Sequence, residues 1–155
     1  MGANILVMAL LVMVTGFALK LLTDEAWVRK DEEAVVAAQS LYATAGMLRA
    51  EVEQGYTVPT ALTPISAAPL PAWYTLPADA SFFLLKHDGH DYLVARFASE
   101  GAAGRVYRHA ERIMPGAPFK VSGGQLRRTS VSAGTRPAPA GVAPSDVIVK
   151  VDGRE

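Results

Sequence analysis

The residues best suited to chemistry are two histidines that flank a turn. His87 and His90 are separated by Asp88 and Gly89, and Asp91 follows them. A His-x-x-His spacing beside carboxylates supplies ligand types that bind divalent transition metals. The same run is typical of a polar β-hairpin tip, because Asp-Gly is a strong two-residue turn signal. We favour the hairpin tip, and we predict no metal and no other cofactor.

A second polar cluster surrounds the third histidine. His109 lies in a segment expected to be helical, with three arginines close to it in sequence. Such a cluster could bind an anion or a carboxylate of a partner. A solvated helix face explains the same residues, and we favour that interpretation. The arginines are Arg105, Arg108 and Arg112.

No other group of residues has a catalytic spacing. The glycine-containing runs 101–104 and 122–124 lack the patterns that cradle phosphates, and no Gly-x-Ser-x-Gly elbow occurs. Absence of cysteine excludes disulfides and cysteine-ligated metals. With 15 basic and 15 acidic residues the formal net charge is zero, without the basic excess typical of nucleic-acid binding. We therefore expect a protein that is not an enzyme and has no nucleic-acid partner.

The first structural element of the chain is an apolar N-terminal segment. Residues 5–22 read ILVMALLVMVTGFALKLL, with Lys20 as the only charge. As a helix they are about 27 Å long, close to the thickness of a bilayer core. They lack the basic n-region and cleavage site of a secretory signal. We expect this segment to span a membrane. The residues assigned to this surface are Ile5, Leu6, Val7, Met8, Leu10, Leu11, Val12, Met13, Val14, Phe17, Leu19, Leu21 and Leu22.

The charges around this segment bear on its orientation. Lys20, Arg29 and Lys30 follow the apolar run and no basic residue precedes it, so the positive-inside rule would keep the rest of the chain in the cytoplasm. We hypothesise instead that a basic leader preceding Met1 has been removed. Met1 then becomes the candidate for N-terminal processing. A start codon encoding Met1 would exclude this hypothesis.

A polar but helix-favouring stretch follows, from Asp24 to Gln54. Its apolar residues recur in steps of four and three, which is the spacing of one helical face. Gly55 is suited to the position after the helix end, and Val58-Pro59 prevents continuation. One helix from Asn4 to Gln54 would be about 75 Å long. The stripe expected to pack on the globular head consists of Trp27, Ala34, Ala38, Leu41, Ala45, Leu48 and Val52.

The remainder predicts a small head of mixed structure. Residues 55–77 hold five prolines and are expected to form a loop, anchored to the core by Leu70, Trp73 and Tyr74. The fold class is α+β, with the apolar half of a long helix protruding and its amphipathic half packed on a small antiparallel sheet. We place the division between the two parts at 1–23 and 24–155. The expected elements are strands 82–86, 92–97, 119–121, 126–131 and 147–151, a helix 100–114 and a flexible loop 132–145.

The order of these features resembles that of type IV pilins, and is closest to the type IVb group of conjugative and minor pilins. The likeness rests on the post-membrane helix 24–45, on 70–73 followed by 83–97, and on 108–113 followed by Gly123-Gly124. There are two departures. Ile5 stands where pilins usually carry a glutamate that pairs with a neighbour's N-terminus, and the C-terminal disulfide common in type IVb subunits is absent.

The resemblance implies a structural subunit of a homo-oligomeric helical filament that acts in adhesion, conjugation or motility. It implies that the apolar segment 5–22 forms the filament core and that Met1 is the processed, methylated N-terminus. It implies a single-pass protein surrounded by inner-membrane lipid before assembly, handled by the pilus assembly machinery, and then part of an extracellular pilus. Two alternatives stay open. One is a single-pass envelope protein whose extracytoplasmic domain binds a partner without polymerising. The other is a membrane-anchored enzyme whose activity would depend on His87, His90 or His109.

Overall fold

A computed structural model of the chain describes residues 2–68, 70–128 and 136–152, with side chains described from Met8 onward except Ala9 and Ala67. The chain divides into two compact units, Met1–Glu33 and Ala34–Glu155, called below the N-terminal and C-terminal units. This division falls later than the predicted one at residue 23, because the buried residues of the helix begin only at Ala34. The fold class is α+β, as predicted, with a long N-terminal helix and an antiparallel sheet.

The first helix, α1, runs without interruption from Gly2 to Glu53. Thr15 and Gly16 do not break it. It ends just before Gly55, whose φ of 102° confirms the predicted left-handed residue after the helix. The other elements are a short 3-10 helix η1 (Ile65–Ala67), the helix α2 (Glu100–Ile113), and the strands β1 (Thr63–Pro64), β2 (Ser81–His87), β3 (His90–Arg96), β4 (Pro118–Ser122), β5 (Gln125–Arg127), β6 (Arg136–Pro137) and β7 (Asp146–Lys150).

Within the described residues the sheet has seven strands in the order β1-β2-β3-β7-β4-β5-β6, and each neighbouring pair is antiparallel. It is therefore larger than the small sheet that was predicted. The last strand in sequence, β7, lies in the middle, and its residues 146–149 are all buried. The two edge strands each contain a proline, Pro64 in β1 and Pro137 in β6. Proline cannot donate to a ladder, so it belongs at edges and discourages pairing with further strands.

The hairpin predicted around the histidines is confirmed. β2 and β3 pair over their full lengths, and His87 faces His90 across the turn. Asp88 and Gly89 have φ values of 49° and 76°, and two consecutive positive φ values are what a two-residue type I′ turn requires.

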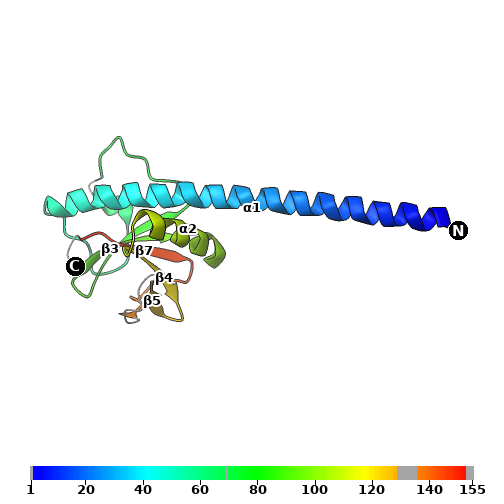
Figure 1. Cartoon of the computed structure of the whole chain (residues 1–155). Coiled ribbons are helices and arrows are strands. Elements are labelled where there is room, and N and C mark those ends of the chain that lie inside the picture. The colour runs from blue at the N-terminus through cyan, green and yellow to red at the C-terminus, as the bar shows by residue number, and fades with distance from the viewer. Residues whose placement is uncertain (1, 69, 129–135, 153–155) are drawn as a thin grey trace. The chain divides into compact units, whose positions relative to one another are not determined.

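One face of the sheet carries the main core, and both helices cover it within the C-terminal unit (Figure 1). Alternate residues of the central strands point to this face, among them Leu84, Leu93 and Val149. Leu41 and Leu48 of α1 are fully buried against them, and α2 adds Ala103, Val106, Tyr107 and Ala110. The part of α1 that belongs to the C-terminal unit, residues 34–53, therefore packs on the sheet.

The opposite face carries a second, smaller core. Tyr92, Val94 and Ile148 are buried there with Phe119 of β4. Leu62 and Val142 from the connecting segments pack on them. Both faces of the central strands are thus buried, which is why β7 reads as an unbroken apolar run instead of an alternating one.

Candidate interaction surface

The apolar side chains of the N-terminal unit are exposed in the structure. Their exposed fractions lie between 51% and 75%. Ile5, Leu6 and Val7 were assigned to the same surface, but their side chains lie outside the described residues, as does Met1. The exposed members are Met8, Leu10, Leu11, Val12, Met13, Val14, Phe17, Leu19, Leu21 and Leu22.

This surface is apolar on every side of the helix. Residues 10–14 are consecutive, exposed and apolar, and five residues turn through more than one full helical turn of 3.6 residues. A helix that is apolar all round is normally buried in protein or in a membrane. The N-terminal unit therefore differs in kind from the amphipathic part of α1 that follows.

The threonines within and directly after the apolar run, Thr15 and Thr23, are hydrogen-bonded to carbonyls of their own helix. Thr15 Oγ1 donates to the carbonyl of Leu11 at 2.7 Å and lies 3.1 Å from that of Val12. Thr23 Oγ1 lies 3.0 Å from the carbonyl of Leu19 and 2.8 Å from that of Lys20. Back-bonded threonine needs no hydrogen bond from water, so these positions do not oppose burial of the surface. In the sequence, the only sign of these side-chain hydrogen bonds is that the polar residues concerned are threonines.

Across the residues that the structure describes, none of the helices combines the length and the apolarity needed to cross a membrane.

The predicted packing stripe of α1 is buried from Ala34 onward. Ala34, Ala38, Leu41, Ala45 and Leu48 are all buried in the main core, and Val52 packs partly buried against it.

The first member of that stripe is an exception. Trp27 belongs to the N-terminal unit and its side chain is 61% exposed, so its packing on the core stays a prediction. Its spacing of seven from Ala34 matches the stripe, but a spacing identifies a helix face and not the point at which that face meets the sheet.

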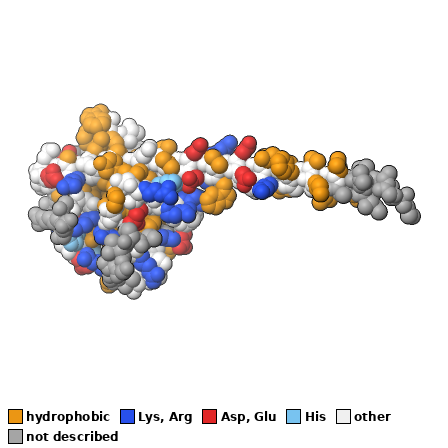
Figure 2. Space-filling model, viewed as in Figure 1, with side chains coloured by type: hydrophobic (Ala, Val, Ile, Leu, Met, Phe, Trp, Pro, Cys, Tyr) orange, Lys and Arg blue, Asp and Glu red, His pale blue; other side chains and the backbone are white. Residues whose placement is uncertain are grey.

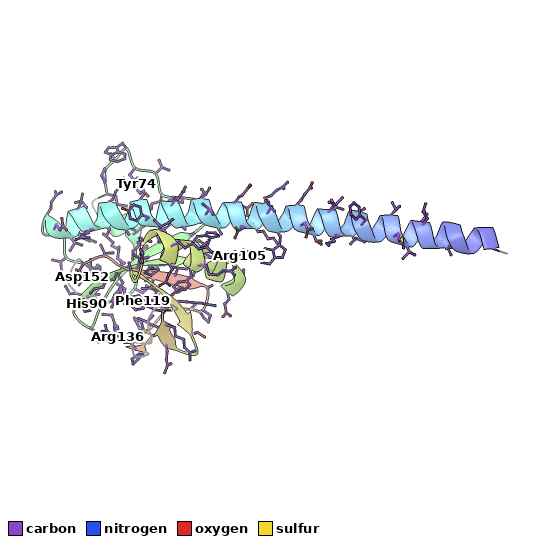
Figure 3. All side chains as sticks on the ribbon, in the orientation of Figure 1. Tyr74, His90, Arg105, Phe119, Arg136 and Asp152 are labelled. Atoms are coloured by element: carbon purple, nitrogen blue, oxygen red, sulfur yellow. The ribbon has the colours of Figure 1, made fainter. Side chains whose placement is uncertain are left out.

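The proline-rich loop is held to α1 by a hydrogen bond between side chains. Thr44 is fully buried, its hydroxyl donates to the carbonyl of Ser40 at 2.8 Å, and it pairs with the hydroxyl of Tyr74. Leu70 packs partly buried against the core, so Leu70 and Tyr74 anchor the loop as expected. The third predicted anchor, Trp73, is 75% exposed and meets Tyr74 only edge-on. Figure 3 shows Tyr74 beside α1.

The two hairpin histidines engage separate carboxylates. His87 Nε2 lies 3.3 Å from Asp88 Oδ2, whereas His90 Nδ1 lies 2.8 Å from Asp152 Oδ2 (Figure 3). Within the described ranges no group of three or more histidine, aspartate or glutamate side chains is arranged to hold a metal ion. His90 thus ties the β2–β3 turn to the residue two positions beyond the end of β7, whereas His87 contacts a carboxylate of the turn itself.

A buried ion pair fixes the entry into the central strand. Asp146 is fully buried, and its carboxylate accepts from Arg96 Nε at 2.7 Å and Nη2 at 2.8 Å. It also accepts from the backbone N–H of Ala143 at 2.7 Å, while Arg96 donates to the carbonyl of Gly141 at 2.8 Å. Hydrogen bonding with Asp146 raises the pKa of the Arg96 guanidinium. Sequence reasoning missed this pair, because no short spacing relates residues that are fifty positions apart.

Two more arginines cover the second core. The guanidinium of Arg128 lies 4.0 Å from the centre of the Phe119 ring, a cation–π geometry. Burial lowers the pKa of Arg128. Burial also raises the pKa of the Tyr92 phenol, and the positive charge of Arg136 opposes that effect. Figure 3 shows Phe119 and Arg136 on the side of the sheet away from α1.

The predicted arginine cluster lies on α2. Arg108 and Arg112 are exposed, whereas Arg105 and His109 are partly buried. In Figure 2 lysine and arginine side chains gather over this helix. The structure thus offers an apolar surface on the N-terminal unit and a basic surface on the C-terminal unit.

No protein-family model, no curated protein and no solved structure matches this chain.

Proposed function

We propose that the chain is a structural subunit of a type IV pilus-like filament, assembled through the apolar surface of its N-terminal unit. The observation that carries the proposal is the run of exposed apolar side chains that encircles α1 from Met8 to Leu22. A surface of this kind requires an apolar environment, which lipid supplies before assembly and sister subunits supply afterwards.

The free energy gained by burying these side chains favours stable assembly over exposure to water. Each large apolar side chain gains roughly 1.5–3 kcal/mol when it is fully buried. Ten such residues, each about two-thirds exposed, would together gain roughly 10–20 kcal/mol on burial. A loss of that size on release into water is comparable to the whole folding stability of a domain. Release of single subunits from the polymer is therefore strongly disfavoured.

The proposed assembly is an open polymer. In such a filament the helix of each copy packs among the helices of the next copies through a heterologous contact, in which different surfaces of the two copies meet. Repetition of such a contact without closure generates a helical filament. The C-terminal unit then supplies the outward surface for adhesion, conjugation or motility. Its two proline-containing edge strands oppose sheet-to-sheet aggregation, which suits an array of closely spaced copies.

Filament formation in cells tests the proposal. The full chain is expressed in a bacterium with a pilus assembly system, surface material is sheared off, and the material is examined by electron microscopy and mass spectrometry. Filaments that contain the chain are expected. A chain that stays in the membrane fraction and is only ever monomeric would overturn the proposal in favour of a single-pass envelope protein.

A matched pair of variants identifies the surface responsible. Val12→Asp places a charge on the apolar surface and is expected to abolish filaments, because a buried unpaired carboxylate is costly. Gln39→Asp introduces the same group at an exposed position of α1 in the C-terminal unit and is expected to assemble normally. The amounts of chain in the membrane fraction are compared, so that loss of insertion is distinguished from loss of assembly.

A further inference from the structure

The helix α2 presents a continuous basic face. Ser99 caps its start, with Oγ accepting from the backbone N–H of Ala102 at 3.1 Å. The buried side of the helix packs on the sheet and fixes its rotation. Positions 105, 108 and 112 are spaced by three and four, so their side chains share one face of the helix. This basic stripe consists of Arg105, Arg108 and Arg112.

The stripe is not neutralised within the part of the chain that the structure describes. None of its three arginines forms an ion pair with a described carboxylate. Arg105 Nε is buried and has no hydrogen-bond partner among the described residues. The nearby carboxylate of Glu100, at the first turn of α2, lies 4.0 Å from Lys120 instead. The positive charge of the stripe is thus available to a partner.

The chain itself carries a complementary surface. Residues 1–33 contain five acidic and three basic residues, a net charge of −2, and the remaining ten acidic and twelve basic residues give residues 34–155 a net charge of +2. The acidic residues of the N-terminal unit fall within ten positions of α1. Four of them are exposed, namely Asp24, Glu25, Glu32 and Glu33. Opposite charges on the two units of one chain favour contacts between different copies in one fixed orientation.

We infer that the basic stripe of α2 docks on the acidic segment 24–33 of a second copy of the chain. This inference rests on the proposed filament and adds the contact that sets the relative position of neighbouring copies. The apolar surface encircles its helix over consecutive residues 10–14, so burial of that part alone fixes neither the rotation nor the axial position of a subunit tightly. Charge pairs are directional and select a register, as they do between the helices of coiled coils.

Charge reversal with co-expression tests the contact. Arg108→Glu/Arg112→Glu reverses the exposed part of the stripe, and Glu25→Lys/Glu32→Lys reverses the segment. Each variant alone is expected to give at least about tenfold fewer filaments than the wild type. Like charges brought together at the contact cost more than ~1.4 kcal/mol, which corresponds to a tenfold change in an equilibrium constant. Co-expression of the two variants is expected to restore filaments, because each then meets its complement on the other chain.

The controls separate the possible failures. Arg127→Glu reverses an exposed arginine outside the stripe and is expected to assemble like the wild type. Wild-type chains that form no filaments would refute the proposed function itself. Wild-type filaments accompanied by undiminished filaments of both reversed variants would refute only the docking contact. Two defective variants whose filaments are not restored by co-expression would likewise refute only the docking contact.

Cross-linking gives a second readout that does not depend on filament yield. The chain has no cysteine, so Arg108→Cys/Glu32→Cys carries the only two thiols. If this variant forms filaments, a short bis-maleimide is expected to link neighbouring subunits within them. The linked subunits then run as a ladder of dimers and larger species on a denaturing gel. Arg108→Cys/Asp79→Cys, with its second thiol at an exposed loop position, is the control. Ladders no stronger than those of the control would overturn the inference.

Discussion

Removal of the buried carboxylate of Asp146 is expected to destabilise the C-terminal unit markedly. The Asp146→Asn side chain keeps its shape but loses the negative charge, and its amide N–H₂ would face the donors of Arg96. Breaking a buried ion pair by removing one partner typically costs 3–5 kcal/mol, leaving the other charge uncompensated. The Arg96 side chain is 34% exposed, so solvent screens part of that loss. We expect a destabilisation of roughly 2–4 kcal/mol.

Thermal unfolding followed by circular dichroism measures this cost. For a unit of this size a loss of roughly 2–4 kcal/mol lowers the Tm by roughly 8–15 °C. Asp79→Asn makes the same chemical change at an exposed loop position and is expected to alter stability by less than ~0.5 kcal/mol. An Asp146→Asn chain as stable as this control would refute the reasoning.

The double variant Arg96→Met/Asp146→Leu separates charge from packing. Replacing both partners by apolar side chains leaves no uncompensated charge, so part of the lost stability is expected to return. The recovery is incomplete because the backbone N–H of Ala143 still loses its acceptor. A double variant less stable than Asp146→Asn would show that packing, and not the charge, dominates at this position.

Three further outcomes are expected within the C-terminal unit. Leu41→Ala empties a fully buried position of the main core and should cost roughly 2–5 kcal/mol in urea unfolding, whereas Gln39→Ala should be near neutral. Tyr74→Phe removes the hydroxyl that pairs with α1, and should speed proteolytic cleavage of the proline-rich loop without lowering the Tm by more than a few degrees. Because burial raises the pKa of Tyr92, its phenol should ionise later than ordinary tyrosines in an ultraviolet absorbance titration, and Tyr92→Phe should remove that late step. The contribution of the neutral Tyr92 phenol to the free energy of unfolding is fully present below about pH 10 and is lost as the pH rises through the pKa of the folded state. Loss of this contribution at lower pH would contradict a raised pKa for Tyr92.

Sequence reasoning succeeded where the signal is local. The 3-4 periodicity identified the face of α1 that packs from Ala34 to Val52, and Asp88-Gly89 identified the hairpin between β2 and β3. Helix α2 and the end of α1 before Gly55 were also located, because capping and breaking residues act on their immediate neighbours.

Long-range features were beyond such reasoning. The insertion of β7 between β3 and β4 depends on pairings between distant segments, and no short pattern encodes them. Strands β1 and β6 have two residues each, which is too few to show any periodicity. Each contains a proline, and proline favours a loop over a strand, so both segments were predicted to be loops. The predicted strand 126–131 corresponds to β5 in its first part, and residues 129–131 lie outside the described residues.

The central claim is that neighbouring copies cover the apolar surface of the N-terminal unit. A single cysteine introduced as Val12→Cys into the otherwise cysteine-free chain reports on this directly, through its rate of reaction with a bulky water-soluble maleimide in sheared filaments. The account predicts near-complete protection of this thiol, while Asp79→Cys in the same filaments reacts freely. Equal reaction rates at the two positions would contradict it.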